Sequence, residues 1–206
     1  HNDSAEEVKR ITRRSISTSS YVLMPCMLGM AAVAKNLVLV LLTEKWLPCV
    51  PFLQLACLAF ALYPIHTANL TAINAMGRSD VFLKVEVIKK IIGIAVLVFT
   101  VPFGLVAMAA GRVISGVVST FVNAHPNKKI LDYSYGEQWR DILPSALVAA
   151  AMSSFVYFIG FIPLPAVLVL FIQITAGIFF YILVSRVFRL EAFSYLLQTL
   201  REFRRG

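Results

Sequence analysis

The side chains best suited to chemistry in this sequence are two cations, Lys35 and Arg112, that lie inside long apolar runs. If such a run crosses a bilayer, a Lys or Arg near its middle costs about 2.5–3.5 kcal/mol on the insertion scale and is by default a functional candidate. We interpret both residues as a cationic wall that faces an anionic group, such as a phosphate. The alternative is an interhelical ion pair, or a side chain that extends along its helix to the membrane surface.

Residues 63–74, inside a second apolar run, carry an unusual concentration of polar side chains. They are Tyr63, His66, Thr67, Asn69, Thr71 and Asn74. Thr67, Thr71 and Asn74 share one helix face by their i, i+4, i+7 spacing. Pro64 removes a backbone donor and is expected to kink the helix. Two interpretations remain open: a helix that lines a hydrated cavity for sugar hydroxyls or a charged headgroup, or polar groups that bond to neighbouring helices.

Two further cations, Lys89 and Lys90, lie in the charged first part of a third run. Glu86 precedes Lys90 by four residues, in the order that favours a helical ion pair, so this pairing is expected. The lysine side chains can also extend toward the headgroups. His66 is better explained as a structural histidine with a hydrogen-bond partner than as a proton carrier.

The sequence contains no nucleophile elbow, phosphate-binding loop, metal-ligand cluster or catalytic carboxylate pair, and its three cysteines form no CxxC or Cys/His spacing. We therefore predict no metal, no cofactor and no enzymatic activity. One enzymatic alternative stays open, a membrane-embedded glycosyl- or acyltransferase. Its catalytic groups would come from the polar stretch 125–141, whose candidates show no recognisable spacing: His125, Asp132, Glu137 and Asp141.

The composition indicates a lipid environment for the elements that carry these residues. Of 206 residues, 59% are hydrophobic and 15% are charged, against about 25% charged in an average soluble domain. The apolar residues gather in continuous runs of roughly 20, the length of a transmembrane helix, rather than in the alternating segments of a membrane barrel. The net charge of +8 would suggest nucleic-acid binding in a soluble protein, but here the basic residues flank the apolar runs. We predict an all-α, polytopic transmembrane helix bundle that binds no nucleic acid.

Six helices are expected, at about 17–42, 50–76, 81–102, 105–124, 142–162 and 166–185. They define a cytoplasmic segment at 1–16, a six-helix transmembrane domain at 17–186 and an amphipathic cytoplasmic tail at 187–206. The third helix is the weakest, because its uninterrupted apolar stretch, 91–103, is too short to span a membrane without the charged turn before it.

The distribution of basic residues predicts the orientation. Of 19 Lys and Arg residues, nearly all fall in the two terminal segments and in the second and fourth connections, whereas the opposite connections hold only Lys45. Cytoplasmic connections are enriched in Lys and Arg. We therefore expect both termini to be cytoplasmic, which requires an even number of crossings.

Several short segments resemble a known family in their order and spacing. They are residues 44–48 (EKWLP), 74–80 (NAMGRSD), 83–86 (LKVE) with 88–90 (IKK), 131–134 (LDYS) and 142–144 (ILP). Together they resemble the C-terminal part of Wzx-like polysaccharide exporters of lipopolysaccharide biosynthesis, which belong to the multidrug/oligosaccharidyl-lipid/polysaccharide (MOP) flippase superfamily. The likeness is greatest to colanic-acid and teichuronic-acid exporters.

The resemblance implies transport across the bacterial cytoplasmic (inner) membrane, where such proteins flip undecaprenyl-pyrophosphate-linked oligosaccharides to the outer leaflet. It also implies a MATE-like architecture of two helical lobes around a cationic cavity that opens to each side in turn. In that cavity Lys35, Arg112, Lys89 and Lys90 would pair with the pyrophosphate. The implied partners are the lipid-linked oligosaccharide and membrane lipids.

This sequence differs from the resembled family in length, because family members have roughly twice as many helices. We therefore expect the chain to be a C-terminal fragment whose further partner is the N-terminal lobe of the same protein. Ion-coupled drug efflux on the same fold remains an alternative. That function needs an intramembrane carboxylate, and Glu86 is the candidate. A structural or assembly subunit is a further alternative, which the polar stretch at 63–74 disfavours.

Overall fold

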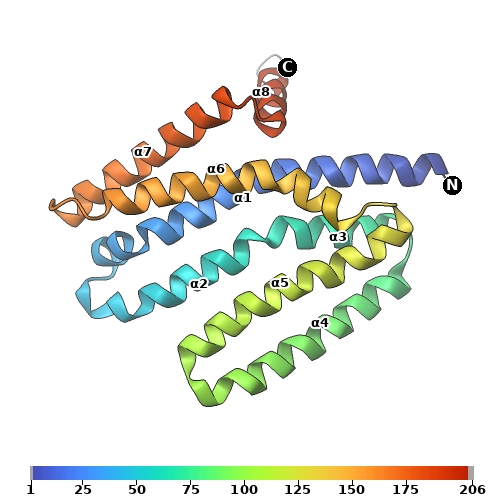
Figure 1. Ribbon diagram of the computed structural model, residues 1–206, viewed down its shortest axis with the longest axis horizontal. Helices are drawn as coiled ribbons and strands as arrows, with labels where there is room; N and C mark the ends of the chain where they lie inside the picture. Colours follow the sequence, from blue (N-terminus) through green and yellow to red (C-terminus); the bar gives the residue numbers. More distant parts are fainter. Residues whose placement is uncertain (1, 204–206) are drawn as a thin grey trace.

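A computed structural model describes the backbone of residues 2–203, and every regular element in this range is helical (Figure 1). This confirms the predicted all-α class. The elements are α1 (Asn2–Leu41), η1 (Glu44–Cys49), α2 (Val50–Ala61), α3 (Tyr63–Ala75), α4 (Ser79–Thr100), η2 (Val101–Phe103), α5 (Leu105–Ile130), α6 (Tyr135–Ile159), α7 (Ala166–Val187) and α8 (Glu191–Phe203).

Five helical stretches within the described residues are long and apolar enough to cross a membrane. They are Ser4–Leu41, Glu44–Ala75, Leu105–Ile130, Tyr135–Ile159 and Ala166–Val187. Of the six predicted membrane spans, the one that does not meet this description is α4, because charged residues crowd its first half. It is also the span that the sequence marked as the weakest. However, α4 runs antiparallel to α5 and packs along it (Figure 1). A membrane that contains α5 therefore also contains the apolar half of α4.

The helices alternate in direction, so the connections gather at two ends of the bundle. The N-terminus and the α3–α4 and α5–α6 connections lie at one end, and η1, η2 and the α6–α7 turn lie at the other (Figure 1). Arg78, Lys128 and Lys129 thus lie at the same end as the N-terminus, as the positive-inside interpretation requires. The side of the membrane that this end faces stays a prediction.

Helix α1 begins at Asn2, well before the apolar run that starts at residue 17. The polar segment before the run is therefore helical and continuous with it, since its Glu, Lys, Arg and Ala residues are good helix formers that hydropathy alone does not register. The depth at which α1 enters the membrane stays a prediction.

The second apolar run is divided at Leu62 into α2 and α3. Pro64 lies in the first turn of α3, where a missing backbone donor costs least. This confirms the kink expected from the sequence. It also sets the polar half of the run, α3, apart from the almost wholly apolar α2.

The hydrophobic core lies where α1, α6 and α7 meet. Its fully buried members include Ile16 of α1 and Ala149 and Val156 of α6. A Cβ atom added to Gly177 of α7 would lie 3.0 Å from Val156 Cγ2. Small residues of this kind let membrane helices approach closely, and dispersion contacts then hold them together.

Helix α8 crosses the bundle at a steep angle to the long helices (Figure 1). Its apolar side packs on the core through Ala192, Phe193 and Leu196, and the Phe193 ring lies 6.2 Å from that of Tyr21 on α1. This arrangement is typical of an amphipathic helix at a membrane surface. The amphipathic helix expected in the C-terminal tail is therefore present.

Candidate functional site

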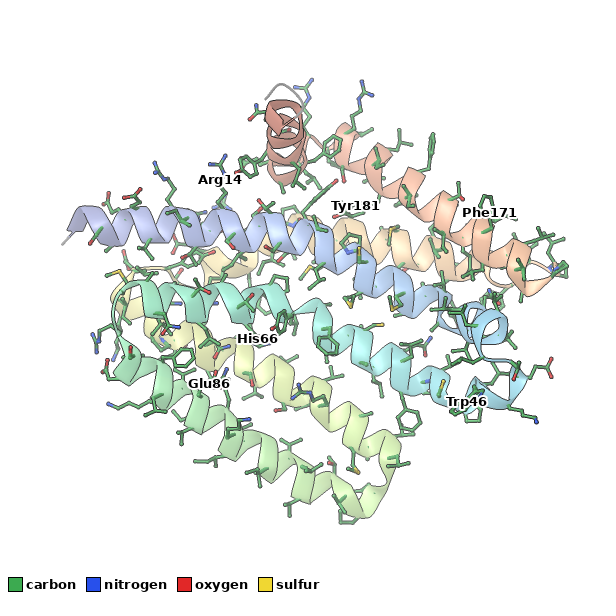
Figure 2. The ribbon with its side chains drawn as sticks, turned by 180° about the vertical axis from the view of Figure 1, so that it is seen from behind. Arg14, Trp46, His66, Glu86, Phe171 and Tyr181 are labelled. Carbon is green, nitrogen blue, oxygen red and sulfur yellow. The ribbon has the colours of Figure 1, made fainter. Side chains whose placement is uncertain are left out.

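Three of the sequence-predicted site residues come together where α3, α4 and α5 meet. The Asn123 amide of α5 donates a hydrogen bond to His66 Nδ1 of α3 (3.0 Å). Lys89 of α4 and Arg112 of α5 lie close enough to act electrostatically on the same imidazole. Figure 2 shows His66 extending from α3 toward the α4/α5 pair. We refer to His66, Lys89, Arg112 and Asn123 as the intramembrane cation cluster.

Within this cluster Lys89 is paired on its own helix, with Glu86. The expected pairing of Glu86 with Lys90 is therefore wrong, and Lys90 is exposed. The reason is the rotation of α4. Its one buried residue, Val85, lies one turn from Lys89 on the same face, so packing turns Lys89 inward and Lys90 outward.

Arg112 has an exposed side chain that makes no hydrogen bond or ion pair with the described residues. Its neighbour Gly111 packs so tightly on α4 that an added Cβ atom would lie 2.9 Å from Thr100 Cγ2 and from Val96 Cγ1. The α4–α5 contact therefore fixes the backbone that carries Arg112. An intramembrane guanidinium without a carboxylate partner is the kind of group that an anionic ligand can neutralise.

Lys35 is likewise exposed, and it has no ion-pair partner in the part of the chain that is described. It lies on α1, which packs on α6, α2, α3 and α7. Unlike Lys89 and Arg112, it exerts no resolved effect on His66. The structure does not bring Lys35 into the intramembrane cation cluster.

A buried amide network ties α3, α5 and α6 together directly beside the cluster. Asn69 Nδ2 donates to Gln138 Oε1 (2.9 Å) and to the Ile65 carbonyl (2.9 Å). Asn127 Nδ2 in turn donates to Asn69 Oδ1 (2.7 Å). The polar atoms of Asn69 are thus used within the protein, which supports the interhelical interpretation. Substrate binding by Asn69 stays a prediction.

Two acceptors at this junction are not used by the protein. The side-chain oxygens of Asn123 and Asn127 are buried and have no hydrogen-bond partner among the described residues. They lie four residues apart on α5, on one face. Buried polar atoms are nearly always hydrogen-bonded, so this unused pair is unusual, but both side chains are fully buried and lie out of reach of a ligand in this conformation.

Thr67, Thr71 and Asn74 are all exposed, so the face of α3 that they share points away from the amide network. The hydroxyl of Thr67 bonds only to carbonyls of its own helix, and Asn74 lies in the last turn of α3. A role for Asn74 in binding stays a prediction.

The charged groups of the basic end form a second assembly. Sequence reasoning treated its Arg13 only as a marker of topology and its Asp141 as a candidate group of the transferase alternative. Arg13 makes a bidentate pair with Asp141, through Nε (2.8 Å) and Nη2 (2.7 Å). The Tyr133 hydroxyl donates to the same carboxylate (2.8 Å). Burial, followed by this bond to Asp141, raises the pKa of Tyr133, so its hydroxyl remains a donor at any physiological pH.

Two of the other candidates of the stretch 125–141, His125 and Glu137, also have side-chain partners within the protein, whereas the exposed carboxylate of Asp132 has none among the described residues. His125 Nδ1 lies 2.9 Å from the Tyr135 hydroxyl. Glu137 completes a capping box with Ser134 at the start of α6 and pairs with Lys9 (3.4 Å). These groups fix the α5–α6 connection and the start of α6 against α1. No group of three potential metal-ligating side chains occurs among the described residues.

One buried polar pair was missed by sequence reasoning. Asn36 Nδ2 of α1 donates to Gln173 Oε1 of α7 (2.9 Å), and Gln173 Nε2 donates to the Val156 carbonyl of α6 (2.9 Å). Gln173 is the only polar residue of the stretch 166–174, and Asn36 follows Lys35 within an otherwise apolar stretch. Their position inside apolar runs was the available signal.

Comparison with known proteins gives two similarities. Residues 1–51 match a family model described as "Polysaccharide biosynthesis protein". The chain is also similar to an "Uncharacterized membrane protein in cps region" of Klebsiella pneumoniae, with 29% identity over 146 residues, which is 70% of this chain and 28% of that protein. The chain thus spans less than a third of the length of this curated relative. No solved structure matches it. The resemblance seen in the sequence is supported as far as polysaccharide biosynthesis and a membrane protein.

Proposed function

We propose that this chain forms one lobe of a transporter in the bacterial inner membrane that flips an undecaprenyl-pyrophosphate-linked oligosaccharide for surface-polysaccharide synthesis. The single observation that carries the proposal is the intramembrane cation cluster, in which Arg112 has no carboxylate partner among the described residues. The similarity to polysaccharide-biosynthesis proteins and to a membrane protein of a cps region supports the class of substrate.

The chemistry of the cluster suits the two parts of such a substrate. A pyrophosphate group is recognised by guanidinium and ammonium groups, and a guanidinium can bind two phosphate oxygens at once. Sugar hydroxyls are donors, and they would reach the unused oxygens of Asn123 and Asn127 only where the packing around α5 opens, because both side chains are fully buried here. Because Lys89 is already partly neutralised by Glu86, Arg112 is the principal candidate for the pyrophosphate.

The rest of the transporter is also part of the proposal. The chain covers only 28% of the relative's length, and a cavity between two lobes needs both. In this arrangement the exposed polar face of α3, with Thr67, Thr71 and Asn74, and the exposed cation Lys35 border the second lobe or the lipid. Both termini would be cytoplasmic.

The two alternatives are less favoured by the side-chain contacts. Ion-coupled drug efflux needs a carboxylate that is free to take up the coupling ion, whereas Glu86 is held by Lys89. A membrane-embedded transferase needs free acid and base groups, whereas Glu137 and Asp141 are held by cations of α1. Transport therefore explains more of the described side chains than either alternative.

The test is complementation by the full-length protein that contains this chain, in a strain that lacks its own exporter. Arg112→Gln is expected to reduce surface polysaccharide by about tenfold or more, because the charge-assisted hydrogen bonds that it would lose to a phosphate are worth about 1.5–3 kcal/mol, whereas Arg112→Lys retains part of the activity. Lys45→Gln removes an exposed cation from the opposite connection and serves as the matched control. Normal export by Arg112→Gln, at equal membrane abundance, would refute the site.

A further inference from the structure

A groove of about 1230 Å³ opens between the N-terminal half of α1, the start of α6 and the start of α8, at the basic end of the bundle. Its lining is rich in cations, which are Lys9, Arg10, Arg13, Arg14, Arg140 and Arg189. Its carboxylates are fewer, namely Glu6, Asp141 and Glu191. The groove is separate from the intramembrane cation cluster and belongs to different helices.

The carboxylate on the α6 wall does not neutralise this excess of positive charge. Asp141 is already occupied by both nitrogens of Arg13 and by the Tyr133 hydroxyl. In contrast, the guanidinium groups of Arg140 and Arg189 are exposed and have no hydrogen-bond or ion-pair partner within the described residues. The groove therefore holds two cationic groups that are available to a ligand.

A third guanidinium is held in place by an aromatic ring. The Arg14 guanidinium lies over the Tyr195 ring of α8, 3.5 Å from the centroid, and Figure 2 shows Arg14 extending from α1 toward α8. Stacking occupies the face of a guanidinium and leaves its N–H edges free to donate. Arg14 is thus oriented in advance for an anion at the edge of its plane.

The groove lies at the boundary between the charged and the apolar parts of its helices. On α1 the N-terminal group of charged residues ends at Arg14, and the groove continues along Ser17 and Thr18. On α6 the groove passes from Arg140 to Pro144, and apolar residues follow. The phosphates of a bilayer leaflet lie at such a boundary, and basic pockets at this depth on the cytoplasmic side bind anionic lipid headgroups.

We propose that this groove is a binding site for the phosphate headgroup of an anionic phospholipid. Arg14, Arg140 and Arg189 hold the phosphate, and the apolar side chains of Pro144 and Phe188 border the start of the acyl chains. The occupant is a lipid rather than free phosphate, because the lining combines cations with exposed apolar side chains. This inference does not depend on the transport proposal.

The backbone of Arg189 provides a favourable test. Arg189 follows the end of α7 with φ +49°, a left-handed conformation that glycine adopts freely and other residues rarely do. Arg189→Gly therefore removes the guanidinium and relieves the backbone at the same time. A loss of lipid binding in this variant cannot be assigned to a damaged fold.

The experiment measures phospholipid binding to the purified chain in detergent by native mass spectrometry. Phosphatidylglycerol is compared with phosphatidylcholine, whose phosphate is balanced by its own cation. The test variant is Arg140→Gln/Arg189→Gly, and the control is Lys128→Gln/Lys129→Gln, which removes the same charge from exposed positions at the same end. Inorganic phosphate is added as the soluble competitor.

We expect the test variant to bind phosphatidylglycerol about thirtyfold more weakly, because each cation near a membrane surface contributes about fivefold to affinity. The control should change by less than about twofold, and the thermal stability of the test variant should not fall. Equal losses in both variants, or equal binding of the two lipids by the unmodified chain, would overturn the proposal. Displacement of phosphatidylglycerol by millimolar phosphate would also overturn it, in favour of a soluble anion.

Discussion

The two sides of this helix bundle use similar apolar sequences in different ways. On one side α1, α6 and α7 share a core, and α6 alone buries seven residues along its length. On the other side α4 buries only Val85. The polar groups follow the same division. Asn36 and Gln173 satisfy one another on the first side, whereas Arg112 on the second side has no partner in the described part of the chain.

This difference suggests separate roles: α1, α6 and α7 form the scaffold, and α4 and α5 carry the surface that we expect to bind. In a membrane, apolar area gives no preference for helix over lipid, so only close packing and polar bonds hold helices together. The α1–α6–α7 side has both, and it is therefore the more firmly held part of the described chain. The α4–α5 pair is tightly packed internally at Gly111 but exposes most of α4. We expect this face to contact lipid, the rest of the transporter or the substrate.

The largest effect on stability should come from a substitution that overpacks the core between α1, α6 and α7. Gly177→Leu places a large side chain where even a Cβ atom lies 3.0 Å from Val156 Cγ2, and such a clash should lower the free energy of unfolding by about 3 kcal/mol. Gly116→Leu on α5 is the matched control, because nothing lies within 4 Å of its added Cβ atom. Denaturant unfolding in detergent measures both. Equal stability of the two variants would contradict the claim that α1, α6 and α7 are more closely packed than the α4–α5 side.

A smaller effect is expected from the buried amide pair. Gln173→Leu leaves the Asn36 amide and the Val156 carbonyl without their partners, at a cost of about 1–2 kcal/mol. The double variant Asn36→Leu/Gln173→Leu removes both amides and should recover part of this loss, as a double-mutant cycle would show. Strict additivity of the two substitutions would mean that the pair does not join α1 to α7.

The smallest effect should appear at the basic end. Asp141→Asn removes the carboxylate from the bidentate pair with Arg13. It should lower the free energy of local opening of the N-terminal half of α1 by about 1 kcal/mol. Hydrogen exchange of residues 4–16 measures this directly. The control Glu7→Gln affects only the long, exposed contact with Arg10, at 3.9 Å, and should leave the exchange unchanged. Identical exchange in both variants would show that Arg13 does not anchor α1.

Most of the helices follow from hydropathy, because the cost of exposing a backbone to lipid leaves little choice of structure. The kink near Pro64 follows from local chemistry in the same way. The helical start of α1 did not follow, because residues 1–16 are polar and reveal their helix propensity only when hydropathy is set aside. Lipid-imposed preferences and the proline kink were therefore readable, whereas the polar helical start of α1 was not.

The site was only partly predictable for a different reason. His66, Lys89 and Arg112 were found because charged and polar residues are rare in apolar runs. Asn123, the partner of His66, and Asn127 and Gln138, the partners of Asn69, were not found, because they are selected by contacts between helices. The partner of Glu86 was wrong for the same reason, since the packing of Val85 sets the rotation of α4. A single sequence contains no information on such long-range pairs.

The central claim is that the α3–α4–α5 junction binds the pyrophosphate of a lipid carrier. The most direct measurement compares the binding of undecaprenyl pyrophosphate and uncharged undecaprenol to the full-length protein. We predict at least about tenfold tighter binding of the pyrophosphate, since charge-assisted bonds are worth roughly 1.5–3 kcal/mol. This preference should be lost in Arg112→Gln and kept in Arg140→Gln/Arg189→Gly. An unchanged preference in Arg112→Gln would contradict the account.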